Sequence, residues 1–458
     1  MTADLAHLRK VHLIGIGGIG VSALGRFFAS RGVELSGSDV HLPPTGSLPS
    51  GIYTSGHHEE NVPTDADLVV FSPAVPETNP ERMRSLLLGI PTVDYPTGLG
   101  LATDAYNTIA VSGTHGKSTT TALMGLLFVE AKLDPSVIVG AAVPEWGANF
   151  RGGKSDLFIV EACEYRRNML RLAPQTIVLT NIELDHPDFY RDLDDITHAF
   201  HDYVAKLGED GLLVYNRDNS VTRKIAEKSD AIKISYGIGE GSDLFAQNIA
   251  EKGGLQNFTL VWKGNTLGEY TSALPGLYNL YNILAAVAAL LAYGGKIDAL
   301  PPVLERFGGV GRRFEIVGIM ENGTTVVSDY AHHPTALREV YTAATKRYPG
   351  KKILTVFQPH QRERTLKLWN DFVCVLGDIA HMILVEPYAV PGREDGMEEC
   401  GKRLVDEVLA KHTQADLVYA KDLAEAERLT GELVKEYDIV LVVGAGDIDK
   451  VARRLITA

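Results

Sequence analysis

The sequence predicts an α/β protein of three domains. Its 458 residues are roughly three times the ~150 residues of a typical domain. Short runs rich in β-branched residues alternate with helical patterns along the chain, which is typical of parallel sheets with crossover helices. Glycine accounts for 45 residues, about a tenth of the chain against a usual ~7%, and two predicted strands run directly into glycine-rich turns. We expect the domains to comprise residues 1–106, 107–312 and 313–458.

The first predicted domain opens with a strand, Val11–Ile16, a glycine loop and a helix that extends through Ser30. Its further predicted strands are Val33–Leu35, Leu68–Phe71 and Pro91–Val93. The loop matches G-x-G-x-x-G in full at Gly15, Gly17 and Gly20, and an acid, Asp39, follows about 20 residues on. Glycines there let a diphosphate approach the backbone at a helix N-terminus. The motif alone leaves open NAD, another pyrophosphate ligand such as a UDP-sugar, or a turn without a ligand.

The second domain opens with a phosphate-loop pattern. The strand Asn107–Ser112 enters Gly113–Ser118, and a helix is predicted over Thr119–Ala131. In that context backbone N–H groups cradle phosphates, Lys117 neutralises their charge, and Ser118 can bind magnesium. The pattern departs from G-x-x-x-x-G-K-[ST] in having valine at its first position. Further elements are predicted at Asp156–Val160, Thr176–Thr180, Leu212–Val214 (strands) and Leu280–Tyr293 (helix).

Acidic residues follow two of these strands. Glu161 and Glu164 come after one strand, and Asp185 and His186 come after another. The carboxyl ends of strands in an open α/β sheet form the ligand crevice. Oxygen ligands from Ser118 and Glu161 would suit magnesium shared with phosphates, and His186 could hold a second ion. Solvated loops are the alternative interpretation.

The third domain contains two further loops of interest. Its predicted elements are the strands Thr325–Ser328, Lys352–Phe357, Met382–Val385 and Ile439–Val443 and the helix Ala424–Tyr437. His332 and His333 follow the first strand, and a stretch that ends at Arg364 follows the second. Arg362 and Arg364 could hold a carboxylate or phosphate through paired hydrogen bonds, unless they are ordinary surface charges. Three glycines at 308–311 predict a hinge before this domain.

Composition excludes several classes of function. The 44 basic and 58 acidic residues give a net charge of −14, which argues against nucleic-acid or anionic-membrane binding. The longest apolar run, Ile283–Tyr293, is far short of the ~20 residues that cross a bilayer. Polar residues at Met1–Lys10 predict no export signal, and three cysteines without a paired spacing in the sequence suit a reducing compartment. We therefore expect a cytoplasmic protein without membrane insertion, either a monomer or a homodimer.

Six stretches together resemble the Mur ligases, the ATP-dependent amide-forming enzymes of peptidoglycan synthesis. They are Gly113–Thr121, Glu161–Tyr165, Thr180–His186, Asp329–Pro334, Phe357–His360 and Gly444–Ile448. The resemblance covers nearly the whole chain. It implies a Rossmann-like UDP-binding domain, a central ATPase domain of the phosphate-loop type and a Rossmann-like C-terminal domain that binds an amino acid. It also changes the interpretation of the first glycine loop from an NAD site to a UDP-diphosphate site.

Within the family, the first loop looks like that of the members that join L-alanine to UDP-N-acetylmuramate through an acyl phosphate, with ATP and Mg²⁺. The resemblance assigns UDP-sugar binding to Gly15, Gly17, Gly18, Ile19, Gly20, Ser22, Ser38 and Asp39. It assigns ATP binding to Gly113, Thr114, His115, Gly116, Lys117, Ser118, Thr119, Asn279, Asn282, Arg313 and Asp329. The metal ligands that the resemblance implies are Ser118, Glu161 and His186. The catalytic residues that it implies are Lys117, His186, His333 and Arg364.

The chain departs from the family pattern at four positions. Tyr278 stands where the adenine-binding stretch usually has histidine, and Gln361 stands where many members have arginine. His201 occupies the place of a lysine that several later enzymes of the family carbamylate, and Ser118 replaces a frequent threonine. Three alternatives remain. The first is a ligase that adds a tripeptide to the same UDP-sugar, but such enzymes usually have a different first glycine loop. The second is an NAD-dependent oxidoreductase, which would explain only the first glycine loop. The third is a nucleotide switch, which would explain only the phosphate loop.

Overall fold

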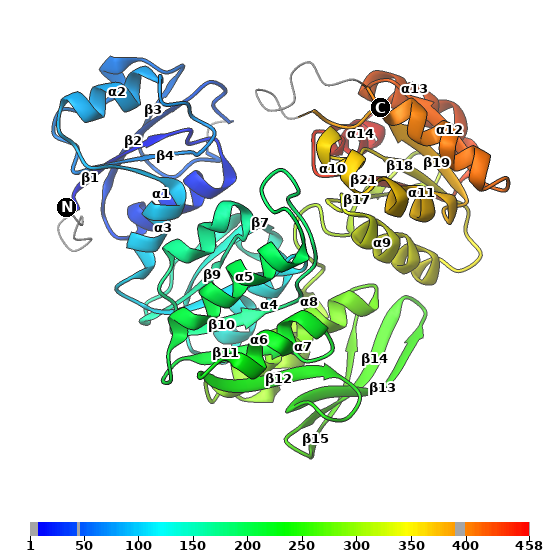
Figure 1. The fold of residues 1–458 in the computed structure, drawn as a ribbon, viewed down its shortest axis with the longest axis horizontal. Helices are drawn as coiled ribbons and strands as arrows, with labels where there is room; N and C mark the ends of the chain where they lie inside the picture. The colour runs from blue at the N-terminus through cyan, green and yellow to red at the C-terminus, as the bar shows by residue number, and fades with distance from the viewer. Residues whose placement is uncertain (1–7, 44–45, 390–398, 458) are drawn as a thin grey trace.

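The computed structural model describes residues 8–43, 46–389 and 399–457, and it contains three separate β-sheets (Figure 1). The predicted α/β fold class is confirmed. Most of the stretch Met1–Lys10, over which we expect no export signal, lies outside the described residues. Within the described part of the chain, no helix has both the length and the apolar character needed to cross a membrane.

The first sheet is parallel, with the strand order β3-β2-β1-β4-β5. Its strands are β1 (Lys10–Ile14), β2 (Glu34–Asp39), β3 (Ile52–Ser55), β4 (Leu68–Phe71) and β5 (Thr92–Asp94). Its helices are α1 (Ile19–Ser30), α2 (Pro80–Leu87) and α3 (Tyr95–Thr103). Helix α1 buries Leu24, Phe27 and Phe28 in the core. Because the strand order reverses between β1 and β4, the glycine loop after β1 lies where ligands bind in such sheets.

The second sheet has ten strands, in the order β15-β14-β13-β12-β11-β10-β6-β9-β7-β8. The strands are β6 (Asn107–Ser112), β7 (Ser136–Val143), β8 (Ala148–Arg151), β9 (Leu157–Glu161), β10 (Thr176–Leu179), β11 (Leu212–Asn216), β12 (Ile232–Ile238), β13 (Leu244–Lys252), β14 (Leu255–Trp262) and β15 (Asn265–Ser272). The helices are α4 (Lys117–Glu130), α5 (Leu193–Val204), α6 (Ser220–Lys228), α7 (Leu277–Ala292) and α8 (Leu300–Arg306). Helices α4 and α7 pack against each other in the core, which explains the apolar, alanine-rich sequence of α7.

The third sheet has the order β16-β17-β21-β18-β19-β20, and only its edge strand β16 is antiparallel. The strands are β16 (Glu315–Ile319), β17 (Thr325–Asp329), β18 (Ile353–Phe357), β19 (His381–Val385), β20 (Asp416–Ala420) and β21 (Ile439–Val443). The helices are α9 (Pro334–Arg347), α10 (Arg362–Lys367), α11 (Trp369–Gly377), α12 (Gly401–Lys411), α13 (Leu423–Leu433) and α14 (Asp449–Thr457).

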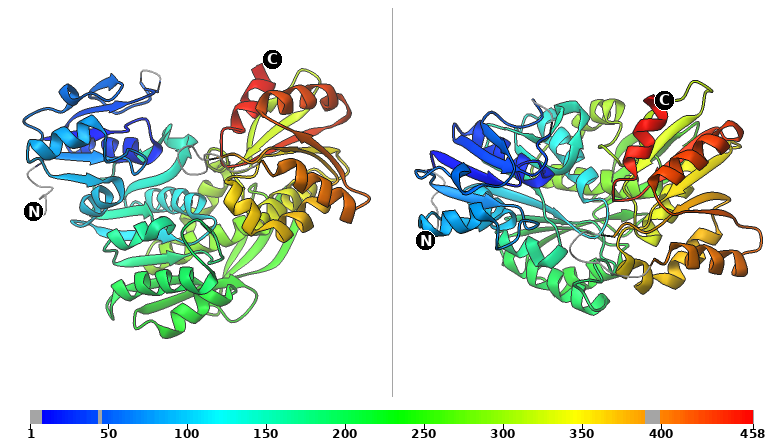
Figure 2. Two further views of the ribbon diagram at one scale, coloured as in Figure 1. Left: turned by 45° about the horizontal axis from the view of Figure 1, so that its top comes forward. Right: turned by 90° about the horizontal axis from the view of Figure 1, so that it is seen from above.

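The first and third units lie on either side of the second, as two views show (Figures 1 and 2). The side chain of Asn149 donates to the Ile19 carbonyl, which ties the second unit to the glycine loop of the first. Lys367 donates to the Pro187 carbonyl, which ties the third unit to the second. The connection before the third sheet includes Gly309 in a left-handed conformation, with φ +107°. These two hydrogen bonds place the glycine loop after β1 against β8 of the second unit, and the end of α10 against the segment after β10.

Candidate active site

The phosphate loop between β6 and α4 has a backbone that requires glycine at two positions. Gly113 has φ +138°, and a Cβ there would lie 2.1 Å from Thr180 Oγ1. Gly116 has φ +81°, and a Cβ there would lie 2.3 Å from Asn282 Oδ1. Side chains at either position would therefore clash as well as strain the backbone. The loop is held in place by Asn181, whose Oδ1 accepts from the His115 N–H at 2.9 Å.

Lys117, the first residue of α4, is half-buried and packs against the loop that precedes it. Its Nζ donates to the carbonyls of Gly113 and Thr114 at 2.6 and 3.0 Å. It also lies 2.9 Å from Glu164 Oε2. Burial by itself lowers the pKa of Lys117, but the negative charge of Glu164 and other nearby groups outweighs it, so the pKa is raised. Lys117 is thus a fixed positive charge at the start of a helix, where phosphates bind.

A group of three ionisable residues lies beside Lys117. The ligand atoms of Glu164, Asp185 and His186 all lie within 4.8 Å of one another. His186 Nε2 is 3.4 Å from Glu164 Oε1. Burial of Glu164 raises the pKa of its carboxyl, but Lys117 and His186 together bring that pKa below its usual value. The side chain that meets His186 is therefore Glu164, a residue to which the sequence pattern assigned no role.

Glu161 is the last residue of β9, and its neighbours differ from those of Glu164, which follows the strand. Glu161 Oε2 accepts from the Gly140 N–H at 2.7 Å, and a Cβ on Gly140 would lie only 2.6 Å from the same oxygen. Glu161 is also close enough for its charge to contribute to the raised pKa of Lys117. Ser118, the other residue expected to bind metal with Glu161, is buried on α4.

A cavity of about 350 Å³ separates the first glycine loop from the second unit. Gly18, Ile19 and Gly20 line one side of it, and Glu161 lines another. Tyr95 at the start of α3 also lines it, and a Cβ on Gly20 would lie 2.8 Å from the Tyr95 ring. Three of the residues expected to bind a UDP-sugar therefore share one cavity with an acid of the second unit.

The other residues expected to bind a UDP-sugar lie around the first glycine loop. Gly17 donates its N–H to Asp39 Oδ2 at 2.9 Å, and the Ser22 hydroxyl donates to the Ile19 carbonyl. Gly15 has φ +82° and donates its N–H to the Ser38 carbonyl at 2.8 Å. The side chain of Ser38 is fully buried, and its hydroxyl donates to Glu81 Oε2 at 2.6 Å. Ser38 thus supports the loop from inside the domain.

A second cavity, of about 370 Å³, adjoins the phosphate loop. Seven of the residues expected to bind ATP line it: His115, Gly116, Thr119, Asn279, Asn282, Arg313 and Asp329. Tyr278 lines it as well, in the place of the family's usual histidine. Asn282 from α7 accepts from the Thr120 hydroxyl of α4, so the two helices share a polar contact at the cavity. Burial raises the pKa of the Asp329 carboxyl. Its two oxygens accept hydrogen bonds from the backbone N–H groups of Phe314 and Ala331.

Arg364 from the third unit is buried against the second. Its Nη2 lies 2.9 Å from Asp185 Oδ1, and its Nη1 donates to the His360 carbonyl at 3.2 Å. Burial raises the pKa of the Asp185 carboxyl, but the Arg364 charge and nearby histidines hold that pKa well below its usual range. Burial and the same arginine lower the pKa of His332 and of His360, the latter to about 4.

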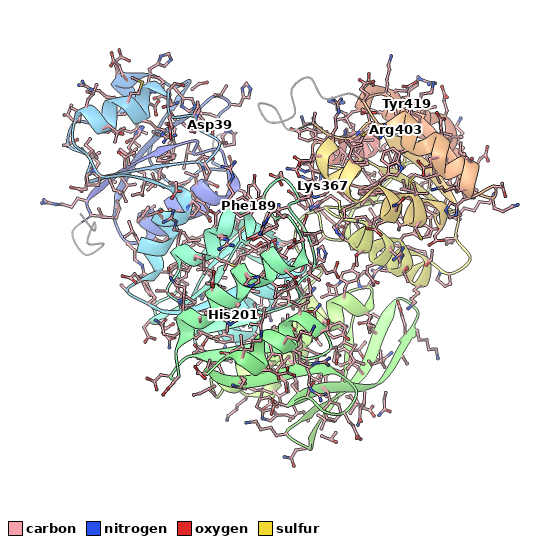
Figure 3. The ribbon with its side chains drawn as sticks, in the orientation of Figure 1. Asp39, Phe189, His201, Lys367, Arg403 and Tyr419 are labelled. Carbon is pink, nitrogen blue, oxygen red and sulfur yellow. The ribbon has the colours of Figure 1, made fainter. Side chains whose placement is uncertain are left out.

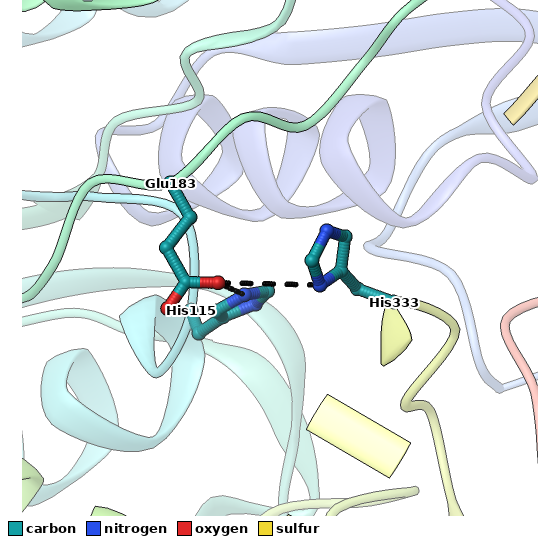
Figure 4. Close-up of side chains that lie close together, drawn as sticks. All are labelled: His115, Glu183 and His333. Atoms are coloured by element: carbon teal, nitrogen blue, oxygen red, sulfur yellow. Dashed lines mark ion pairs between the residues drawn. The ribbon is translucent and has the colours of Figure 1, made fainter. Parts of the chain in front are cut away.

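His333 caps the N-terminus of α9 and faces the phosphate loop (Figure 4). Its Nδ1 lies 4.0 Å from Glu183 Oε2, which in turn lies 3.5 Å from His115 Nε2. Burial and the neighbouring His115 lower the pKa of His333, so its imidazole is neutral near pH 7. The two residues predicted to act from the third unit, His333 and Arg364, therefore both reach loops of the second unit.

Comparison with known proteins accounts for this arrangement. Descriptions of the Mur ligase family match three successive segments: "Mur ligase family, catalytic domain" over residues 10–107, "Mur ligase middle domain" over 111–290 and "Mur ligase, glutamate ligase domain" over 312–446. A UDP-N-acetylmuramate–L-alanine ligase of Alkaliphilus metalliredigens is 37% identical over 458 residues, 99% of this chain and 98% of the relative. The chain belongs to the Mur ligase family.

Two more relatives of the Mur ligase family extend the comparison. A UDP-N-acetylmuramate–L-alanine ligase of Caldanaerobacter subterraneus subsp. tengcongensis is 34% identical, over 100% of this chain and 99% of the relative. The crystal structure of a UDP-N-acetylmuramate-alanine ligase from Thermotoga maritima is 25% identical, with a TM-score of 0.81 over 98% of this chain and 99% of that one. The similarity therefore extends over all three units of this Mur ligase.

Three of the family departures have clear places in the structure. His201 is exposed on α5, on the surface of the second unit (Figure 3). Gln361 is buried with φ +70°, and its Oε1 accepts no hydrogen bond from a described residue. Tyr278 is half-buried, and burial raises the pKa of its hydroxyl well above the usual value. The hydroxyl of Tyr278 is therefore protonated at neutral pH, and its buried oxygen makes no hydrogen bond with a described residue.

Proposed function

We propose that this Mur ligase joins L-alanine to UDP-N-acetylmuramate, with release of ADP and phosphate. The observation that carries the proposal is that the phosphate loop, which adjoins one cavity, contacts the end of β9 and the residues after it, which line the other. Glu161 lines the cavity next to the first glycine loop. Glu164, three residues on, is paired with Lys117 of the loop that adjoins the other cavity. A carboxylate substrate in the first cavity and ATP in the second would therefore meet beside Lys117.

The first step transfers the γ-phosphoryl group of ATP to the carboxylate of UDP-N-acetylmuramate, giving an acyl phosphate and ADP. Lys117 would stabilise the negative charge that spreads over the phosphoryl oxygens. Gly18, Ile19 and Gly20 would hold the UDP diphosphate through backbone N–H groups at the start of α1. Binding both anions in fixed positions converts the encounter into an effectively intramolecular reaction.

Magnesium fits the side chains beside the phosphate loop. The hydroxyl of Ser118 and the carboxylate of Glu161 are oxygen donors of the kind that magnesium prefers, and the Glu164–Asp185–His186 group offers further ligands. We propose that Ser118 and Glu161 hold one ion together with ATP, and that His186 holds a second. When bound, these ions would neutralise the oxygens of two anions that must approach each other.

The second step joins the amine of alanine to the acyl carbon, and phosphate leaves. Arg364 would hold the carboxylate of alanine and aim its amine at that carbon. Its Nε has no hydrogen-bond partner among the described residues, so the guanidinium keeps a donor although Asp185 occupies Nη2. His333 would orient the amine or accept the proton that the amine loses, because its lowered pKa keeps it neutral.

The proposal assigns a separate task to each domain. Residues 1–106 would bind the UDP-sugar, 107–312 would bind ATP, and 313–458 would bind alanine. The glycines at 308–311 would let the third domain move against the second, and closure would keep water away from the acyl phosphate. Every side chain in this scheme comes from one chain, so either a monomer or a homodimer could work. Because ATP is the energy source, we place the reaction in the cytoplasm.

A coupled assay for ADP tests the proposal against the alternatives. A ligase should release ADP only when UDP-N-acetylmuramate, ATP and an amino acid are all present. A nucleotide switch would bind or hydrolyse ATP without regard to the amino acid. An oxidoreductase would change the absorbance of a nicotinamide cofactor and leave ATP intact. ADP release that is independent of alanine would contradict the proposed reaction.

A further inference from the structure

We propose that His115, Glu183 and His333 form a binding site for a zinc-class transition-metal ion that links the second and third domains (Figure 4). One ligand atom from each residue lies within 4.8 Å of the other two. His115 and Glu183 belong to loops of the second domain, whereas His333 is the first residue before α9 of the third. The site is separate from the magnesium ligands of the proposed reaction.

The distances are close to those of a four-coordinate ion. Ligands that lie 2.0–2.1 Å from a tetrahedral zinc are roughly 3.3–3.4 Å from one another. His115 Nε2 and Glu183 Oε2 are 3.5 Å apart. His333 Nδ1 and Glu183 Oε2 are 4.0 Å apart. His333 would therefore have to move roughly 0.6 Å toward Glu183 to reach the tetrahedral spacing, and the ligand atoms of the two histidines already lie within 4.8 Å of each other.

The backbone around two of the ligands is firmly held. His115 donates its N–H to Asn181 Oδ1 at 2.9 Å, and its carbonyl accepts from Thr180 Oγ1 at 2.6 Å. Glu183 donates its N–H to Thr114 Oγ1 at 2.9 Å. These hydrogen bonds tie the phosphate loop to the loop after β10, so His115 and Glu183 are fixed relative to each other. Fixed ligands are what a metal site needs if binding is not to carry a large entropic cost.

The third ligand is held less strongly and comes from the other domain. His333 Nδ1 accepts one hydrogen bond from the Thr335 N–H, at 3.3 Å, which is long for such a contact. An ion would compete with that bond for the same lone pair. His115 Nε2 makes no hydrogen bond with a described residue, although it faces the Glu183 carboxylate. Two imidazole nitrogens and one carboxylate oxygen would thus be available to one ion.

The chemistry of the ligands selects the class of metal. Two imidazoles and one carboxylate suit zinc, cobalt or nickel, whereas magnesium prefers oxygen ligands throughout. His115 and Glu183 also line the second cavity, so the fourth position would face that cavity and take a water or a phosphate oxygen. An ion that binds only when His333 is in place would stabilise the closed arrangement of the two domains by mass action.

Metal titration of the full chain, without substrates, tests the site. Protein freed of metal with a chelator should bind one Co²⁺ with the visible spectrum of a four-coordinate ion, and Zn²⁺ should displace it. Loss of groups that merely support a metal ligand costs roughly 10–100-fold in affinity, so loss of a direct ligand should cost about a hundredfold or more. We therefore expect Glu183→Gln and His333→Asn each to weaken Co²⁺ binding by that factor. Asparagine keeps the helix cap of α9, so the second variant should fold normally.

The matched control is His186→Gln, which alters the neighbouring Glu164–Asp185–His186 group and should leave Co²⁺ affinity within about twofold. Zn²⁺ should also slow proteolysis of the connection at 308–311 in the wild type and have no such effect in His333→Asn. Unchanged Co²⁺ binding in both Glu183→Gln and His333→Asn, or its loss in His186→Gln, would overturn the proposal. Equal proteolysis with and without Zn²⁺ in the wild type would overturn the link between the domains. None of these outcomes depends on ligase activity, so the site and the proposed function can fail independently.

Discussion

Arg364 Nη2 lies 2.9 Å from Asp185 Oδ1, and the two side chains are only 2% and 4% exposed. Arg364 belongs to α10 of the third domain, and Asp185 follows β10 of the second. A buried ion pair thus joins the domain proposed to bind alanine to the domain proposed to activate the carboxylate. Breaking such a pair by removing one partner leaves an uncompensated buried charge.

Replacement of Arg364 should act mainly on alanine. Loss of a charged hydrogen bond to a carboxylate costs about 2–3 kcal/mol, so Arg364→Ala should raise the KM for alanine roughly a hundredfold. Binding of ATP and of UDP-N-acetylmuramate, measured by titration calorimetry, should stay nearly normal. Arg362→Ala, on the same helix, serves as the comparison and should change the alanine KM less. If the alanine KM holds and ATP binding collapses, Arg364 belongs to the phosphate site instead.

Replacement of the two acids after β9 should separate their roles. Glu161→Gln should raise the magnesium concentration needed for half-maximal activity, because one oxygen ligand of the proposed ion loses its charge. Glu164→Gln should chiefly weaken the hold on Lys117, from which Glu164 Oε2 is 2.9 Å away, and so lower kcat. Magnesium titrations of the two variants at saturating substrates give the comparison. A raised requirement in Glu164→Gln alone would move the first ion from Glu161 to Glu164.

Substitution in the first glycine loop should affect only the UDP-sugar. A Cβ at Gly17 would lie 2.9 Å from Asp39 Oδ2, and the Gly17 N–H donates to that same oxygen. Gly17→Val should therefore displace the loop and abolish binding of UDP-N-acetylmuramate while ATP binding persists. Gly32→Ala, at the surface turn after α1, is the control for a general loss of stability, since φ +80° strains an alanine there although no atom lies within 4 Å of the added Cβ. Wild-type protein that binds NAD and has no affinity for the UDP-sugar would reverse the interpretation of the loop.

Stability should fall in mildly acidic solution because the half-buried His360 has a lowered pKa. Burial and the Arg364 charge lower the pKa of His360 from 6.5 to about 4. Below pH 6.5 the unfolded chain binds a proton that the folded chain does not, so stability decreases as the pH falls from 6.5 toward 4, by up to about 3 kcal/mol for His360. The carboxyls of Asp185 and Glu164, whose pKa values are lowered, contribute stability that is lost only at still lower pH.

The measurement is urea unfolding of wild type and His360→Gln at pH 7 and pH 5. The wild type should lose more of its free energy of unfolding between these pH values than the variant does. The exposed His201 supplies the control substitution, His201→Gln, which should behave as the wild type does. Equal losses in wild type and His360→Gln would show that folding does not lower the pKa of His360.

The sequence pattern was most informative where local geometry allows few residue types. Gly113 and Gly116 have left-handed backbone conformations between β6 and α4. The sequence predicts this loop because a strand is followed by two glycines, a lysine and a helix. The parallel core strands are also predictable, because a strand that is buried on both faces needs a continuous run of apolar residues. The histidines and the arginine of the third domain were found because each follows such a strand.

Other features depend on contacts that spacing does not reveal. Strands β13–β15 form antiparallel hairpins with turns at Gly253–Gly254 and Lys263–Gly264, and all four turn residues have left-handed conformations. The glycines of these turns are a hairpin signal in the sequence, but the pairing of the strands is visible only in the fold. Glu161 ends β9 and Glu164 follows it, and the pairing of Glu164 with His186 depends on how the chain turns after β9. The Arg364–Asp185 ion pair joins residues 179 positions apart in two domains (364 − 185 = 179), so only the folded arrangement could reveal it.

Mass spectrometry of the product tests the central claim most directly. The wild-type protein would be incubated with UDP-N-acetylmuramate, ATP, magnesium and an equimolar mixture of L-amino acids and a cell-wall tripeptide. The proposed function predicts one main product, UDP-N-acetylmuramoyl-L-alanine, formed in equal amount with ADP. A product that carries the tripeptide would place the chain with the recycling ligases of the family, and ADP formation without any amide product would contradict the account.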